Sequence, residues 1–352
     1  MSQKTFQTRY ISYVLLALTC LLTACSGGGS SSEELDPPTP NPTPNPTPEN
    51  QEIKLNANVW NMMEGMRAST YDDQAAIQTE GHFTCTVYQA NNTTPYINTT
   101  TVDWNGDPTN KWLFSDGKHY WPASGSLDFF AYMPATKPSY ISSITYNARS
   151  PQFFCENLPM TYNSDSPTEG QGSGLQEFVW GVTIGQNKAN QGASGVTMKF
   201  RHPFARIKFQ LSASHPDIQI NSITFKNLKT GGTCKMNNTV IADTYYYTTS
   251  VWSSPTGSSN FVMTLSGDAA TFNNNPISPL KQIGVDLIMI PQAWAGEIEV
   301  NASWTEWGEA KDNQTLTATV PTNWQSGYSY TYTFTITEFD LKVDIARFTE
   351  QW

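Results

Sequence analysis

The sequence has few cysteines, few charged residues and few convincing helical patterns. Only 5 cysteines occur in 352 residues, and they form neither a Cys-x-x-Cys pair nor a zinc-type spacing. Charged residues make up 14% of the chain, and the formal net charge is −10. Because an acidic chain repels nucleic acid and anionic membrane surfaces, we expect neither as an electrostatic partner.

The sequence also lacks the motifs of common enzyme classes. Its 4 histidines form no HExxH motif, and there is no G-x-S-x-G elbow, P-loop or dinucleotide fingerprint. Asp103, Asn105 and Asp107 have the spacing of a calcium loop, but Pro108 and Phe114 occupy the positions of its Gly and acid, so we expect a plain turn. We predict no catalytic residue, metal or cofactor, although a glycosidase pair of carboxylates has no sequence signature.

The first 24 residues have the pattern of an export signal. Lys4 and Arg9 precede an apolar run at 11–22, which is too short for a stop-transfer helix. The run ends in "LTAC", a lipoprotein pattern that predicts lipidation of Cys25; an ordinary secretory signal is the alternative. Residues 25–50 are rich in Ser, Gly and Pro and are expected to form a tether, whose Pro-rich part spans about 40 Å at about 3.1 Å per residue.

Apolar and polar residues alternate with a period of two through most of the remaining chain. Such runs predict β-strands with one buried face, and the Gly, Pro, Asn and Ser clusters between them predict turns. We expect an all-β fold of two β-sandwich domains, 51–212 and 213–352, with the junction near 212–216, and a short helix near 72–78. The clearest alternating runs are 53–59, 82–88, 196–200, 205–211, 284–290, 297–304, 316–320 and 328–336.

Both ends of this region have an alternating strand. The first strand places Ile53, Leu55, Ala57 and Val59 on one face, and Arg67 follows as the lone Arg between the signal and residue 149. Arg67 is either a trypsin-like cleavage site or a simple surface charge. The last strand places an apolar face in a position either to complete its own sheet or to be donated to a neighbouring subunit. That face consists of Leu341, Val343 and Ile345.

Cysteines and aromatic residues leave several alternatives open. Cys85 lies on a strand pattern and is expected to be a buried free thiol, whereas the pairing of Cys85, Cys155 and Cys234 is not determined. His82 is expected to face solvent. The stretch 243–252 is the best candidate for an exposed aromatic surface, although its aromatic residues also suit a strand or core.

Several motifs together resemble the Bacteroidetes fimbrillin family, the subunits of type V pili. They are "LTAC" with Cys25, "YWPASGSLDFFAYMP", "VTMKFRHPFARIKFQL" and "VPTNWQSGYSYTYTFTI", and they span most of the mature chain. The resemblance implies two transthyretin-like β-sandwiches, no enzymatic activity, and a lipoprotein that reaches the outer membrane and cell surface. It also implies that a trypsin-like protease cuts after Arg67 and removes the strand Ile53 to Val59. A strand of the next subunit, with Leu341, Val343 and Ile345 as the candidate, would then fill the groove.

The sequence analysis therefore predicts a structural and adhesive fimbrial subunit whose partners are other fimbrillin subunits, the processing protease and a host or bacterial surface ligand. The alternative is a surface lipoprotein that binds glycans through exposed Trp and Tyr side chains. A glycan hydrolase is a third, weakly supported alternative.

Overall fold

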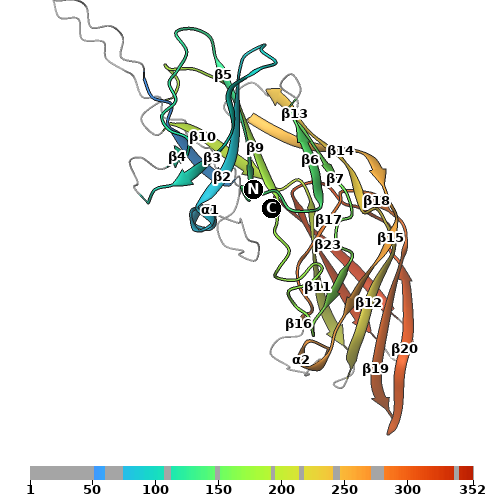
Figure 1. Cartoon of the computed structure of the whole chain (residues 1–352). Helices are drawn as coiled ribbons and strands as arrows, with labels where there is room; N and C mark the ends of the chain where they lie inside the picture. The colour runs from blue at the N-terminus through green and yellow to red at the C-terminus, as the bar shows by residue number, and fades with distance from the viewer. Residues whose placement is uncertain are drawn as a thin grey trace, which may run out of the picture. The chain divides into compact units, whose positions relative to one another are not determined.

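The computed structural model describes residues 51–59, 74–106, 112–146, 151–191, 195–213, 218–240, 246–270, 281–336 and 341–351. These residues belong to one unit of the chain, Asn50–Trp352, and most of them lie in β-strands (Figure 1). The helices of the described part are α1 (Gln74–Glu80) and α2 (Gly267–Ala270). Neither is long and apolar enough to cross a membrane. The protein is therefore all-β, as the alternating pattern predicts.

Seven strands form a closed sheet in the order β1-β10-β9-β5-β2-β3-β4. β1 closes this sheet because it pairs in parallel with β10 and antiparallel with β4. The closed sheet differs from the open sandwich expected for residues 51–212, since β1 joins two edges that would otherwise stay apart. Its strands are β1 (Leu55–Val59), β10 (Val196–Arg201), β9 (Val179–Gln186), β5 (Leu127–Met133), β2 (His82–Gln89), β3 (Pro95–Trp104) and β4 (Trp112–Phe114).

The other described strands form four further sheets, in the orders β16-β11-β22-β23 with β17 on β11, β20-β19-β12-β15-β8, β14-β13-β7-β6 and β18-β21. The first and second of these share one hydrophobic core. Their strands are β6 (Ile141–Thr145), β7 (Gln152–Cys155), β8 (Thr161–Asn163), β11 (Ala205–Ala213), β12 (Gln219–Leu228), β13 (Gly231–Val240), β14 (Tyr246–Thr256), β15 (Ser259–Thr264), β16 (Lys281–Gln282), β17 (Leu287–Met289), β18 (Ala293–Trp294), β19 (Glu297–Glu306), β20 (Glu309–Thr319), β21 (Thr322–Asn323), β22 (Tyr328–Ile336) and β23 (Leu341–Gln351).

Buried side chains of the described residues form three hydrophobic cores. The first core lies within the closed sheet, the second packs β5 and β9 against β7 and β13, and the third packs β11 and β22 against β12 and β19. The first core includes Ile53, Leu55, Phe83, Cys85, Trp112 and Phe200. The second includes Phe130, Phe153, Phe178, Trp180, Phe204 and Cys234. The third includes Ile207, Phe209, Phe225, Val300, Trp324 and Tyr332.

β5 lies between the first and second cores, and this position explains why both of its faces are apolar. Phe129 and Ala131 belong to the first core, whereas Phe130 belongs to the second and Tyr132 packs against it. A strand buried on both faces reads as a nearly continuous apolar run. The aromatic residues of this strand therefore build the fold and are not displayed.

One predicted strand is shorter than expected. The alternation over 284–290 predicts a full strand, but β17 covers only Leu287–Met289. Gly284 has a φ of 65°, which interrupts the extended backbone, and the Asp286 carboxylate is held 2.7 Å from Nη2 of Arg206. The predicted helix appears as α1, two residues later than the predicted range of 72–78.

Strands from both sides of the expected domain junction share sheets. β7 pairs with β13, β8 pairs with β15, and β11 pairs with β22. Residues 214–217 of the junction lie outside the described residues, and the division of the chain into domains 51–212 and 213–352 stays a prediction.

Candidate functional site

The first described strand, β1, is inserted between two strands that lie far from it in the sequence. Leu55 to Val59 pair in parallel with Val196 to Phe200 of β10, and Leu55 also pairs with Trp112 of β4. Removal of β1 would leave β10 and β4 with free edges, and it would open the closed sheet. We call the strands and loops that hold residues 51–59 the β1 seat, and this seat is the candidate site.

The apolar face of β1 is almost completely buried in the first core. Ile53, Leu55 and Ala57 are 4%, 2% and 0% exposed, whereas the side chain of Val59 lies outside the described residues. Burial of an Ile or Leu side chain contributes about 1.5–3 kcal/mol. The strand is therefore a substantial part of this core and not a loosely attached extension.

Backbone hydrogen bonds hold the residues just before β1. The Ile53 amide donates to the carbonyl of His119 at 2.8 Å, and the Trp121 amide donates to the carbonyl of Gln51 at 3.0 Å. On the other side, the Val196 amide donates to the carbonyl of Lys54 at 2.8 Å. The segment is thus bound on both edges before β1 begins.

A buried glutamine, Gln191, completes this contact. Its Oε1 accepts hydrogen bonds from the Lys54 amide at 2.9 Å and from Nε1 of Trp121 at 2.8 Å, and its Nε2 donates to the carbonyl of Glu52 at 3.3 Å. Gln191 is 4% exposed. A buried polar group that is left without a hydrogen-bond partner destabilises the folded chain. The hydrogen bonds of Gln191 therefore fix the position of the strand that follows. We call this arrangement the Gln191 clamp.

Gly195 allows the backbone to pass close to the same segment. Its φ is 81°, and a Cβ atom at this position would lie 2.4 Å from the carbonyl oxygen of Lys54. A side chain here would therefore meet backbone atoms, and a left-handed backbone would also be strained. The glycine is required by the β1 seat itself.

The candidate donor strand, β23, occupies a different kind of position. It pairs antiparallel with β22 from Ile336↔Leu341 onward and forms an edge of its sheet. Leu341 is 4% exposed, and Val343 and Ile345 are partly buried against the third core. In this structure the strand completes its own sheet, so the apolar face that would fill another groove already has a partner.

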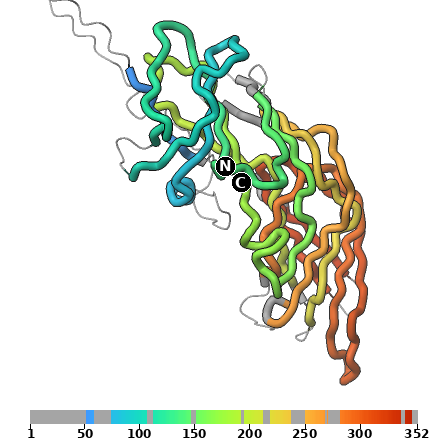
Figure 2. Tube along the Cα trace, in the orientation of Figure 1, coloured from blue at the N-terminus to red at the C-terminus, as the bar shows by residue number. Residues whose placement is uncertain are grey.

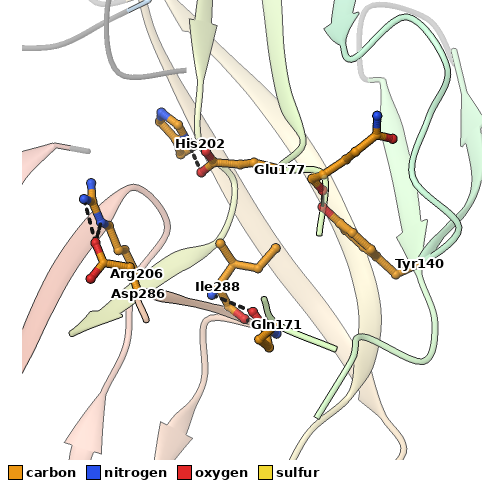
Figure 3. A network of polar contacts seen from close by, with 8 residues as sticks. Tyr140, Gln171, Glu177, His202, Arg206, Asp286 and Ile288 are labelled. Atoms are coloured by element: carbon orange, nitrogen blue, oxygen red, sulfur yellow. Dashed lines mark hydrogen bonds and ion pairs between the residues drawn. The ribbon is translucent and has the colours of Figure 1, made fainter. Parts of the chain in front are cut away.

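A group of polar contacts ties the loops between the second and third cores (Figure 3). Nδ1 of His202 lies 2.7 Å from Oε1 of Glu177, and these side chains are 1% and 7% exposed. The Gln171 side chain donates to the carbonyl of Ile288 at 3.0 Å and accepts from its amide at 3.1 Å. Because the imidazole and the carboxylate are closed off from solvent, their contact serves the packing of the chain.

The structure also places the other residues that the sequence analysis singled out. Cys25 and Arg67 lie outside the described residues, as does Asp107 of the calcium-like spacing. In the described part of the chain, no group of three His, Cys, Asp or Glu side chains could hold a metal ion. His82 is exposed, as predicted.

The three described cysteines are free and buried, as predicted for Cys85. Burial raises the pKa of the Cys155 thiol to about 12 and raises the pKa of Cys85 well above its usual range. Both thiols therefore stay protonated and unreactive in the folded chain near neutral pH.

Of the aromatic side chains in the stretch 243–252, the structure describes that of Trp252. Trp252 donates from Nε1 to the carbonyl of Pro203 at 2.7 Å and packs against Phe153 and Phe204 of the second core. The side chains of residues 243–249 lie outside the described residues. Sequence reasoning also missed Gln191, because a single polar residue in a loop carries no recognisable pattern.

Comparisons with known proteins place the chain in a family. The model of the fimbrillin-like family matches residues 67–352. No curated protein matches the chain. Among solved structures, a candidate cell adhesion protein from Bacteroides ovatus is 16% identical, with a TM-score of 0.49 over 85% of this chain and 96% of that one.

Two further solved structures are similar to the chain. A candidate cell adhesion protein from Bacteroides uniformis is 14% identical, with a TM-score of 0.49 over 84% of this chain and 98% of that one. The tip fimbrial protein Mfa3 from Porphyromonas gingivalis is 9% identical, with a TM-score of 0.41 over 86% of this chain and 100% of that one. The family model covers most of the sequence, and the chain belongs to the fimbrillin-like family.

Proposed function

We propose that this protein is a structural and adhesive fimbrial subunit that assembles by exchange of a β-strand. The precursor is exported as a lipoprotein, is lipidated at Cys25 and reaches the outer membrane. A trypsin-like protease then cuts after Arg67, the segment with Ile53, Leu55, Ala57 and Val59 leaves, and a strand of the next subunit takes its place. Membership in the fimbrillin-like family supports the fimbrial role.

The β1 seat is the observation that carries this proposal. β1 is 5 residues long, its side chains Leu55 and Ala57 are buried, and it is the strand that closes the sheet. Its loss would expose an apolar groove between β10 and β4 that is worth several kcal/mol of burial. Such a groove favours a replacement strand with the same period of two, because main-chain pairing and alternate side chains are both restored.

The family match begins close to the proposed cut. It starts at residue 67, after the end of β1, and it extends to residue 352. A protease that needs an arginine would be blocked by Arg67→Ala and also by Arg67→Lys.

The β1 seat also restricts how β23 could act as the donor. Ala57 is 0% exposed, so its pocket has little spare volume, and larger side chains in a packed core cost about 1–3 kcal/mol. A donor strand that runs in the same direction as β1 can fill the seat in different registers. In one register Ile345 takes the position of Ala57, and in the next the smaller Val343 does. The second register is favoured, with Leu341 at the Leu55 position and Ile345 at the Val59 position.

Processing is the step to test first. The full chain is incubated with an arginine-specific protease, and the product is sequenced from its N-terminus. We expect a new start at Ala68 for the natural sequence and none for Arg67→Ala or Arg67→Lys. Retention of β1 in the mature surface protein of the producing bacterium would contradict the proposal. In our proposal residues 51–212 and 213–352 correspond to the two transthyretin-like sandwiches of a fimbrillin.

A further inference from the structure

The hairpin of β19 and β20 extends beyond the rest of its sheet (Figures 1 and 2). The pairing of β12 with β19 ends, in the direction of the hairpin turn, at Gln219, the first residue of β12, which lies opposite Ser303. Past that point the two hairpin strands pair only with each other, at Trp304↔Lys311, Thr305↔Ala310 and Glu306↔Glu309. We call residues 306–309 the hairpin tip.

The hairpin tip displays a tryptophan in an unfavourable backbone conformation. Trp307 is 92% exposed, whereas Trp304, three residues earlier, is 7% exposed and packs in the third core. Trp307 has a φ of 51° and Gly308 a φ of 85°, as in the two-residue turns that favour Asn-Gly. A bulky residue is disfavoured at such a position, so the turn itself does not explain the indole.

The carboxylates on either side of the turn also destabilise the chain when no partner is bound. Glu306 and Glu309 face each other directly across the hairpin, and like charges in this position are destabilising. In the described part of the chain, no ion pair joins either carboxylate to a basic side chain, although Lys311 lies two residues after Glu309. Exposed indole, positive φ and opposed carboxylates thus occur together in four residues.

We propose that the hairpin tip is a docking surface for a basic segment of a partner protein. A Lys or Arg side chain over the indole face would gain a cation–π interaction and would relieve the repulsion between Glu306 and Glu309. A second copy of this chain, with its net charge of −10, is a poor match in charge. A neutral glycan could stack on Trp307 but would leave the repulsion in place. The proposal does not rest on strand exchange, since β1 and β23 belong to other sheets than the hairpin and contribute no residue to its tip.

The binding test uses the full chain in detergent and a defined probe. The probe is a peptide of alternating Lys and Gly, and its counterpart carries acetyl-lysine at every Lys. We expect the full chain to bind the first peptide in a salt-sensitive manner and not the second. Trp307→Asn and the double variant E306Q/E309Q should each weaken binding by about 3- to 30-fold, the range of cation–π and charge contacts. Asp312→Asn, an exposed acid on β20 away from the tip, is the matched control and should bind normally.

A stability measurement separates a binding role from a structural one. Because Asn tolerates a positive φ, Trp307→Asn should melt at the same temperature as the natural chain or higher, and E306Q/E309Q should behave likewise. A lower melting temperature for either variant would assign these residues to folding and would overturn the proposal. Unchanged peptide binding by Trp307→Asn, or retention of a neutral polysaccharide in place of the peptide, would overturn it as well.

Discussion

The two terminal strands of the described chain have the same alternating pattern but different surroundings. β1 lies between β10 and β4, and its side chains Leu55 and Ala57 are 2% and 0% exposed. β23 pairs with β22 at the edge of a sheet, and among its described apolar side chains, those of residues 341–346, only Leu341 is as deeply buried. An apolar alternation therefore does not by itself tell whether a strand is enclosed or at an edge.

This difference suggests how each strand could leave its sheet. An edge strand breaks one ladder of hydrogen bonds when it separates, and local opening at an edge costs less than global unfolding. β1 breaks contacts on two sides together with the Gln191 clamp, so it is expected to stay in place unless the chain is cut. The comparison is consistent with the proposed roles, in which cleavage removes β1 and β23 is the strand that is exchanged.

Truncation of either end should give the largest effects. A chain that starts at Ala68 loses the burial of Ile53 and Leu55 and should lose roughly 5 kcal/mol of unfolding free energy, while a chain that ends at Asp340 should lose roughly 3 kcal/mol. Urea denaturation of the monomeric forms measures both values. If removal of β23 costs more than removal of β1, the comparison is wrong. A chain that lacks only residues 26–50 is the control and should be as stable as the full chain.

Single substitutions sharpen the same comparison. Leu55→Ala removes a side chain that is 2% exposed and should destabilise the chain by about 2–5 kcal/mol. Ile345→Ala removes a partly buried side chain and should cost about 1 kcal/mol. The two variants are compared by thermal and urea unfolding. Equal losses of unfolding free energy would mean that β23 is as enclosed as β1. Asn58→Ala, at an exposed position of β1, serves as the control.

The Gln191 clamp should have a smaller effect that is specific to the start of β1. Gln191→Leu leaves the Lys54 amide and Nε1 of Trp121 without their acceptor, at a cost of about 1–3 kcal/mol. Amide hydrogen exchange at Lys54 should become faster, while exchange in β23 should not change. Gln186→Leu, whose side chain donates to the nearby Ile184 carbonyl, is the matched control. Unchanged exchange at Lys54 would show that the clamp does not hold the strand.

Thiol reactivity should report the loss of β1 without any change in sequence at the cysteines. Cys85 belongs to the first core, as do Leu55 and Ala57 of β1, whereas Cys155 and Cys234 lie in the second core. Burial keeps the pKa of all three above the usual range, so these three thiols of the intact chain should react slowly with a thiol reagent near pH 8. In the chain that starts at Ala68, Cys85 should react first. Equal reactivity of the three thiols would show that loss of β1 opens more than the first core.

The sequence predicts the strands of this fold better than their pairing. Alternation locates β11 and β22, because a half-buried strand needs apolar residues at every second position. It does not show that Arg206 pairs with Ser329 in a parallel ladder, since register between distant strands depends on the packing of the whole core. For the same reason the alternation at 53–59 predicts β1 but not the closed sheet that β1 completes.

The candidate site was predictable only in its apolar part. Ile53, Leu55 and Ala57 are visible as one face of a strand, and the structure places them in one core. Gln191 and Gly195 act through single contacts with the backbone of residues 52–54, and such contacts leave no pattern in a sequence. The sequence indicates the exposed position of Trp307 only weakly. A Trp-Gly pair between two acidic residues is compatible with a two-residue hairpin turn.

Assembly after cleavage tests the central claim most directly. The full chain and a chain that ends at Asp340 are each treated with an arginine-specific protease and analysed by gel electrophoresis without boiling. We expect a ladder of stable oligomers from the full chain after cleavage at Arg67, and only monomers from the chain that lacks residues 341–352. A cleaved full chain that stays monomeric, or a ladder that forms without β23, would contradict the account.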